Sequence, residues 1–168
     1  MNSAFPHTIL IEQLWISPGH DFKGRFGQSR LEHPVTSPPS IHCIQNRGIE
    51  GDRYFDFKDN FKGQITFFSA EVADALRAFI QQPDWNPIDT RRNVLTRGIE
   101  LPTLIGKTFT LGTLQLYGSE HCAPCFWMDQ AVAPGVSQWL EGKGGLRCKI
   151  LNTATLTLGA QSLKFIDS

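Results

Sequence analysis

The chain has little cysteine, no net charge and no long apolar run, and each absence excludes a class of protein. Four cysteines among 168 residues are too few for the disulfide framework of a small secreted protein. Sixteen basic and sixteen acidic residues cancel, so no whole-molecule field draws the chain onto nucleic acid or an anionic membrane. Any site for an anion must therefore be local.

Two further absences concern location. No stretch approaches the roughly 20 apolar residues of a membrane span, and residues 1–7 lack the basic segment and apolar core of a secretion signal. We therefore expect a cytoplasmic protein with no membrane or nucleic-acid partner. In a reducing compartment, its thiols are expected to be buried, catalytic or metal-bound.

The apolar residues occur in short runs bounded by turn residues, a pattern typical of β-strands. With 40 % hydrophobic and 11 % aromatic residues, the chain can bury one core, which predicts a single domain over residues 1–168. Gly112-Thr113 is typical of a type II′ hairpin turn. The expected strands are residues 8–16, 40–45, 64–68, 93–96, 108–111, 114–117, 146–151, 153–158 and 162–166.

Helix signals are fewer. Ser69 is a suitable N-cap for a helix with apolar residues at positions 72, 76, 79 and 80, and Pro83 marks its end. A second short helix is expected around residues 136–140, closed by Gly142. Strands and helices do not alternate regularly, so we predict a mainly β (α+β) fold, a mixed or antiparallel β-barrel with a few short helices.

The motif Cys122-Ala123-Pro124-Cys125 is the strongest chemical signal. It has three functional interpretations: half of a zinc site, a redox dithiol, or one reactive thiol with a neighbour. A zinc site lacks a convincing second half, and the long helix that follows a thioredoxin dithiol is interrupted at Pro134-Gly135. Simple packing of both thiols is disfavoured, because Pro124 and the adjacent His121 indicate an irregular, polar turn.

Arg91-Arg92-Asn93 lies before an expected strand. Taken alone, it is a solvated turn; functionally, arginine forks suit phosphate oxygens and an Asn amide suits the edge of a pterin. Residues 48–53, which include Asp52 and Arg53, and the Gly144-Gly145 segment before Arg147 could likewise be only tight turns. None of these signals carries a function alone.

In their order along the chain, these segments resemble the molybdenum-cofactor sulfurase C-terminal domain, the MOSC family, in its small stand-alone bacterial form. The resemblance covers residues 8–166. The segments that carry it are residues 11–18, 48–53, 91–94, 98–101, 122–125 and 144–148.

The resemblance implies a β-barrel that binds the molybdenum cofactor (molybdopterin). In members that reduce N-hydroxylated compounds, the cysteine corresponding to Cys125 is the molybdenum ligand, and an Arg-x-Asn segment, here Arg91 and Asn93, holds the pterin and its phosphate. We expect Cys122 and His121 to support Cys125 in catalysis. Further cofactor-binding residues are expected to be Arg92, Asp52, Arg53 and Arg147.

Several functions remain open within this resemblance. The protein could transfer sulfur to the cofactor, reduce N-hydroxylated compounds with molybdenum, or act as a non-catalytic cofactor carrier; a thiol–disulfide oxidoreductase is the alternative outside the family. The expected partners are a small-molecule cofactor or substrate and an electron-transfer protein or cysteine desulfurase. Pyridoxal phosphate would belong to that separate desulfurase.

The sequence departs from the amidoxime-reducing members in one relevant way. Those members have a basic residue immediately before the ligand cysteine, where this chain has Pro124. Two geometric expectations follow from the resemblance. Cys125 and Arg91 should line one pocket, and Asn93 should point the same way as Arg91, because alternate residues of an extended segment share a face.

Overall fold

The computed structural model describes residues 6–25 and 27–167, and its centre is a closed β-barrel. Residues 1–5, part of the segment expected to lack a secretion signal, lie outside the described ranges. Around the barrel the strands follow the order β1-β10-β6-β7-β8-β4-β5. Their bounds are β1 His7–Leu14, β4 Ile65–Ser69, β5 Val94–Arg97, β6 Thr108–Leu111, β7 Leu114–His121, β8 Leu146–Ile150 and β10 Gly159–Phe165.

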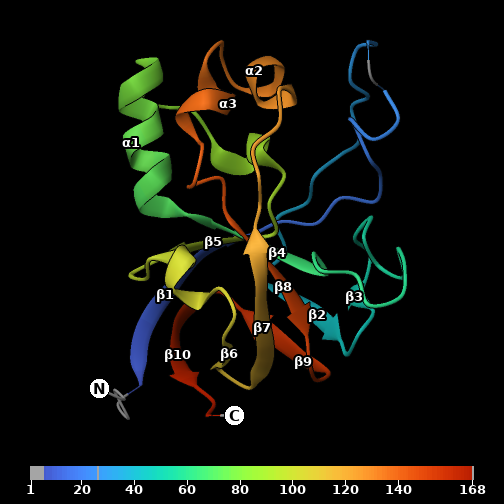
Figure 1. Ribbon diagram of the computed structural model, residues 1–168, viewed down its shortest axis with the longest axis vertical. Helices are drawn as coiled ribbons and strands as arrows, with labels where there is room; N and C mark the ends of the chain where they lie inside the picture. The colour runs from blue at the N-terminus through green and yellow to red at the C-terminus, as the bar shows by residue number, and fades with distance from the viewer. Residues whose placement is uncertain (1–5, 26, 168) are drawn as a thin grey trace.

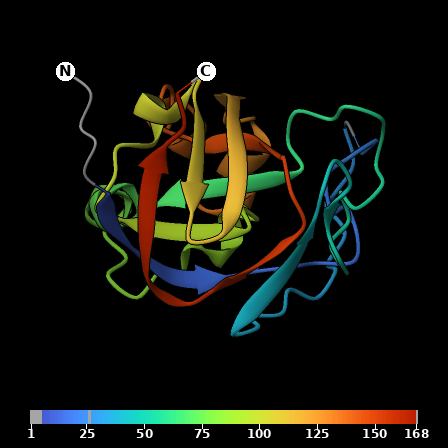
Figure 2. The ribbon, with the colours of Figure 1, turned by 90° about the horizontal axis from the view of Figure 1, so that it is seen from below.

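Every neighbouring pair in the barrel is antiparallel except β4 and β5, which run parallel. Parallel strands need a long crossover, which helix α1 (Ala70–Ile80) and the 3₁₀ helix η1 (Pro87–Thr90) provide between them. The mixed barrel predicted from the sequence is therefore confirmed. Figure 2 looks at it from below, with β2 and its connecting loops to one side.

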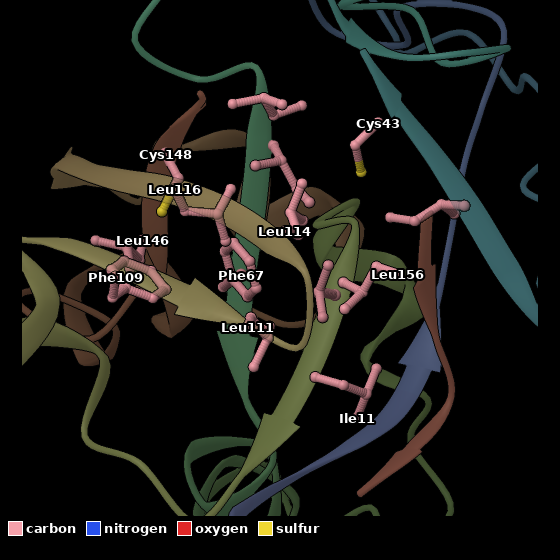
Figure 3. Packing of buried hydrophobic residues seen from close by; sticks show 14 of the residues in the cluster. Ile11, Cys43, Phe67, Phe109, Leu111, Leu114, Leu116, Leu146, Cys148 and Leu156 are labelled. Carbon is pink, nitrogen blue, oxygen red and sulfur yellow. The ribbon is translucent and has the colours of Figure 1, made fainter. Parts of the chain in front are cut away.

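The barrel interior is filled by alternate residues of each strand. In β7 the burial pattern alternates from Leu114 onward, so that Leu114, Leu116 and Gly118 face inward. Figure 3 shows these leucines packing with Phe67 and Phe109 inside the barrel. Burial of such large side chains supplies most of the driving force for closing the sheet.

Helix α1 covers a second apolar cluster outside the barrel. Ser69 caps it as expected, since its hydroxyl accepts from the Val72 N–H at 3.1 Å. The buried face of the helix includes Leu76, which packs with Phe68 and Trp85. The helix ends at Ile80, before the predicted stop at Pro83.

A small second sheet lies beside the barrel, in the order β3-β2-β9. Its strands are β2 Ser40–Ile44, β3 Gly48–Ile49 and β9 Ala154–Thr157. The sequence predicted two of these strands but not that they form a separate sheet. Residues 48–49 were interpreted as part of a turn, because a strand of two residues leaves no periodic signal.

The remaining helices were only partly predicted. Helix α3 (Val136–Trp139) lies in the expected segment, but α2 (Trp127–Ala131) and the 3₁₀ helix η2 (Leu101–Leu104) were not anticipated. Both are about one turn long, too short for a helical period to show. The Gly112-Thr113 hairpin is confirmed, with positive φ at Gly112.

The elements divide between the two ends of the barrel. Figure 1 shows α1, α2 and α3 at one end and both chain termini at the other. Strand β7 runs toward the helical end and leads into the segment before α2. This end therefore holds the cysteine motif. In the described part of the chain, no helix has the length and apolarity to cross a membrane.

We expect Leu116→Ala to lower the free energy of unfolding by about 2–5 kcal/mol, because it leaves a cavity in the barrel. Urea denaturation would measure the loss. Leu10→Ala is the matched control, since Leu10 lies on barrel strand β1 but is 41 % exposed. Equal losses in the two variants would contradict the interior placement of Leu116.

Candidate functional site

A cavity of about 200 Å³ opens at the helical end of the barrel. A narrow inner extension of about 40 Å³ continues from it and shares six of its lining residues. We call the two together the arginine pocket. The residues that line both parts are Arg53, Tyr54, Arg91, Arg92, Cys122 and Arg147. The main cavity is also lined by His20, Asp21, Phe22, Lys23, Thr90, Ala123, Cys125, Trp127 and Met128.

The arginine pocket is not the largest cavity. One of about 550 Å³ lies between the start of α1 and residues 98–102, and its lining contains no cysteine, histidine or arginine. Size alone would select that cavity. We place the candidate site in the arginine pocket because two thiols and several fixed charges meet there.

Cys122 and Cys125 both line the pocket, but in different surroundings. Cys122 is 3 % exposed, and its backbone N–H donates to the Gly145 carbonyl at 2.8 Å, which fixes it to the start of β8. Cys125 is exposed, in the loop before α2. One thiol is therefore held inside the pocket and the other is accessible from solvent.

Two glycines allow Cys122 to come this close to β8. A Cβ on Gly145 would lie 2.3 Å from the Phe67 carbonyl oxygen, and its φ of +118° also disfavours other residues. A Cβ on Gly144 would lie 2.5 Å from the Cys122 carbonyl oxygen. Glycine is therefore needed at positions 144 and 145 because other backbone segments pass close to them, as well as because the chain turns there.

Arg91 lines the pocket, but its guanidinium is already bound within the protein. Nη1 donates to Asp21 Oδ2 at 2.8 Å, and Nη2 donates to Ser17 Oγ at 2.9 Å and to the Gly19 carbonyl at 2.7 Å. Burial lowers the pKa of Arg91, as does the charge of Arg53, while Asp21 opposes both. Arg91 mainly holds residues 17–21 in place as one wall of the pocket.

Asp21 connects this arginine to a histidine. Its Oδ1 accepts from the His33 backbone N–H at 2.8 Å and lies 2.8 Å from His33 Nδ1. Burial raises the pKa of Asp21, but the hydrogen bonds from His33 and the charge of Arg91 outweigh it, and the pKa lies below its usual value. The carboxylate is therefore ionised at neutral pH.

Arg53 is also anchored. Its Nη2 donates to the Arg91 carbonyl at 3.0 Å, and its Nη1 lies 3.3 Å from Asp52 Oδ1. Asp52 accepts from the Ser17 N–H at 3.1 Å, so it stabilises the same loop that Arg91 holds. Asp52 does not line the pocket, and its expected contact with a cofactor stays a prediction.

Arg92 and Arg147 are the less constrained arginines. The Arg92 guanidinium donates to two backbone carbonyls, those of Gly144 at 3.1 Å and Thr90 at 3.2 Å. Burial lowers the pKa of Arg147, but the charge of Cys122, a hydrogen bond with its sulfur and Glu120 outweigh it, and the pKa lies above its usual value. These two guanidinium groups are the ones best able to hold an added anion.

Asn93 does not share the pocket with Arg91, so that expectation is wrong. Asn93 Oδ1 accepts from the backbone N–H and the hydroxyl of Thr66, both at 3.0 Å, and its amide donates to the Trp15 carbonyl at 3.2 Å. The alternation argument fails because Arg91 adopts the left-handed conformation, φ 56° and ψ 26°, rather than an extended one. Asn93 instead joins β1, β4 and β5 in the barrel wall.

Of the remaining expectations about site residues, one agrees with the structure and one stays untested. Cys125 and Arg91 line one pocket, as predicted, together with Cys122, Arg92, Arg53 and Arg147. His121 ends β7, is exposed and does not line the pocket, so its supporting role stays a prediction.

Sequence reasoning missed the contribution of the loop after Pro18. His20, Asp21, Phe22 and Lys23 all line the cavity, although the segment has no sequence pattern beyond its polarity. Aromatic residues Phe22 and Trp127 stand 5.1 Å apart, ring centre to ring centre. They give the pocket an apolar part.

The pocket is positively charged inside a neutral protein. Its main cavity is lined by one lysine and four arginines against the single carboxylate of Asp21, counting described residues. Burial lowers the pKa of the neighbouring His20, and the charges of Arg53 and Lys23 lower it further. The local field therefore favours an anion. This agrees with the sequence argument that, in a chain without net charge, any anion site must be local.

A family model, the MOSC domain, matches residues 50–161, and the chain belongs to this family. No curated protein matches the chain in a sequence comparison. Among solved structures, the YuaD protein of Bacillus subtilis has a TM-score of 0.74 at 17 % identity, over 97 % of this chain and 98 % of that one. YiiM of Geobacillus stearothermophilus has a TM-score of 0.69 at 15 % identity, over 95 % of this chain and 75 % of that one. At these identities the likeness concerns the fold.

We expect Asp21→Asn to lower the free energy of unfolding by about 3 kcal/mol, because it leaves the Arg91 charge buried without its partner. Thermal and urea unfolding at pH 7 would measure this. Asp56→Asn is the matched control, since Asp56 also pairs with an arginine, Arg47, but at an exposed position. The control should change stability much less.

The pH dependence provides a second readout of the same pair. The folded-state pKa of Asp21 is lowered, so its contribution is present above the ordinary carboxyl pKa of about 3.9 and is lost as pH falls through the folded value. The stability difference between wild type and Asp21→Asn should shrink below about pH 4. A difference that stays constant from pH 7 to pH 3 would contradict the assignment.

Proposed function

We propose that this protein binds the molybdenum cofactor in the arginine pocket and uses a pocket thiol to transfer sulfur to it. The observation that carries the proposal is that one cavity is lined by two thiols and four arginines. Thiolate sulfur is a soft ligand suited to molybdenum, and arginine forks suit phosphate. Membership of the MOSC family supports the same interpretation.

The donor set fits a metal that brings ligands of its own. Within residues 6–25 and 27–167, no three His, Cys, Asp or Glu side chains are grouped so as to hold a metal ion. A bare zinc ion would need about four protein ligands. A pterin-bound metal needs fewer, and a single pocket cysteine can complete its coordination.

Within this proposal the residues divide the work. Cys125, exposed at the pocket mouth, is the thiol that a sulfur donor can reach. Arg92 and Arg147 hold the anionic groups of the cofactor, since their guanidinium groups are not tied to buried carboxylates. Arg53 and Arg91 position the loops around them. The bound cofactor supplies the metal that accepts sulfur or electrons.

A second candidate function is the reduction of N-hydroxylated compounds. It is favoured by the apolar side of the pocket, where Phe22, Trp127 and Met128 line the same cavity as Cys125. Such a surface could receive the organic part of a substrate. The sulfur-transfer proposal requires a sulfur donor such as a cysteine desulfurase, with its own pyridoxal phosphate; the reductase would require an electron-transfer partner.

We expect Arg92→Met to lower cofactor occupancy by about tenfold, because it removes a charge-assisted hydrogen-bond donor from the pocket. Molybdenum and pterin content would be measured on protein purified from a host that makes the cofactor. Arg47→Met is the matched control, since Arg47 is exposed and does not line the pocket. Arg91 is a poor choice because its loss would also release residues 17–21.

Cys125→Ser tests, in the same preparation, whether the exposed thiol also completes the coordination of molybdenum. A hydroxyl stays protonated near neutral pH and binds molybdenum poorly, so molybdenum content should fall while the thermal melting temperature is retained. Wild-type protein free of molybdenum and pterin from such a host would contradict the proposal. So would full occupancy in both pocket variants.

A further inference from the structure

The two cysteines of the motif differ in burial and in their neighbours. Cys125 lines only the main cavity, whereas Cys122 lines both the main cavity and its inner extension. Four arginines line that extension, Arg53, Arg91, Arg92 and Arg147, and the charge and hydrogen bonding of Cys122 help to raise the pKa of Arg147. The accessible thiol thus lines only the main cavity, and the buried thiol lines both parts of the pocket together with the four arginines.

We propose that Cys122 is a second sulfur acceptor, to which sulfane sulfur taken up at Cys125 is passed inward and held as a persulfide anion beside Arg147. This inference rests on the proposed function for its purpose, the supply of sulfur to the bound cofactor. It gives Cys122 a catalytic role of its own, beyond the support of Cys125 that the sequence suggested.

The inner extension has the size that this requires. Its volume is about 40 Å³, more than the roughly 10–15 Å³ that one water-sized atom needs. Gly63, which has no side chain, and Thr66, whose side chain is small, form part of its wall. One additional sulfur atom on Cys122 therefore has room, and Arg92 and Arg147, whose guanidinium groups are not tied to buried carboxylates, can stabilise its negative charge.

The chemistry balances without an oxidant. A persulfide or polysulfide donor R–S–S⁻ transfers its outer sulfur to the Cys125 thiolate, which leaves R–S⁻ and Cys125–S–S⁻. The Cys122 sulfur then attacks the outer sulfur of Cys125–S–S⁻; the new S–S bond forms on Cys122 as the bond to Cys125 breaks. The Cys122 thiol proton passes to the released Cys125 thiolate, so the products are Cys122–S–S⁻ and Cys125–SH.

The other two cysteines are unsuited to this role. Cys43 and Cys148 are fully buried in the barrel core and line neither part of the pocket. Burial raises the pKa of Cys43 to about 12 and that of Cys148 well above its usual value. They remain protonated thiols and serve as internal references in a cysteine-mapping experiment.

The test loads the purified full-length protein with inorganic polysulfide, alkylates it and locates the added sulfur by peptide fragmentation in a mass spectrometer. In wild type the sulfur is expected on Cys122. In Cys122→Ser it should remain on Cys125, where cyanide should remove it faster than from wild type because Cys125 is exposed. In Cys125→Ser, loading of Cys122 should slow by about tenfold or more, since the donor must reach a buried thiol.

Arg147→Met tests the anion-holding part of the proposal. It should lower the fraction of persulfide found on Cys122 by about tenfold, since a charge-assisted hydrogen bond to the anion is lost. Arg147→Lys, which keeps the charge, should restore much of it. Arg47→Met is the control, and thermal melting of each variant verifies the fold.

Three results would overturn the relay: added sulfur that stays on Cys125 in wild type, a Cys122–Cys125 disulfide with release of sulfide, or no loading of either thiol. The outcome is separable from that of the proposed function. Cofactor occupancy with sulfur confined to Cys125 would reject the relay alone. Loading of Cys122 in a protein that never acquires molybdenum or pterin would reject the cofactor proposal alone.

Discussion

The buried Arg91–Asp21 pair is the interaction on which the rest of the site depends. It joins the end of η1, just before β5, to the loop after Pro18 through a 2.8 Å contact, and Asp21 extends it to His33. Because both side chains are more than nine-tenths buried, either one alone would be an uncompensated charge. The geometry of the loop is therefore coupled to that of the arginine segment, and together they form one wall of the pocket.

A consequence is that the pocket arginines are not equivalent. Arg91 and Arg53 are committed to Asp21 and Asp52 and to backbone carbonyls. Among the described residues, the Arg92 guanidinium has only backbone carbonyls as hydrogen-bond partners. The committed arginines build the walls, and the others leave their charge available to an incoming anion. The two thiols also differ. Cys122 is buried and bound to the start of β8, whereas Cys125 lies in a loop and is exposed.

Much of the fold could be predicted because its signals are local. The Ser69 cap and the glycine-first hairpin are encoded by a few neighbouring residues. The mixed barrel followed from short strands without regular helix alternation. The small second sheet could not be predicted, since β2 meets β9 only through a pairing of residues more than a hundred positions apart.

The site was predictable as a set of residue types and less so as a geometry. The meeting of Cys125 with the Arg91 segment came from the family resemblance and is confirmed. Asn93 was misplaced because a single left-handed residue, Arg91, turns the chain before the strand begins. The unequal burial of Cys122 and Cys125 depends on a contact with Gly145, which no spacing of cysteines encodes.

The most direct test of the central claim is a crystal structure of protein purified from a cofactor-synthesising host, with anomalous diffraction recorded at the molybdenum edge. The account predicts a molybdenum peak in the arginine pocket beside a motif cysteine, with the cofactor phosphate near Arg92 or Arg147. A zinc peak between the two cysteines would contradict it. A cofactor seated in the larger cavity beside α1 would contradict it as well.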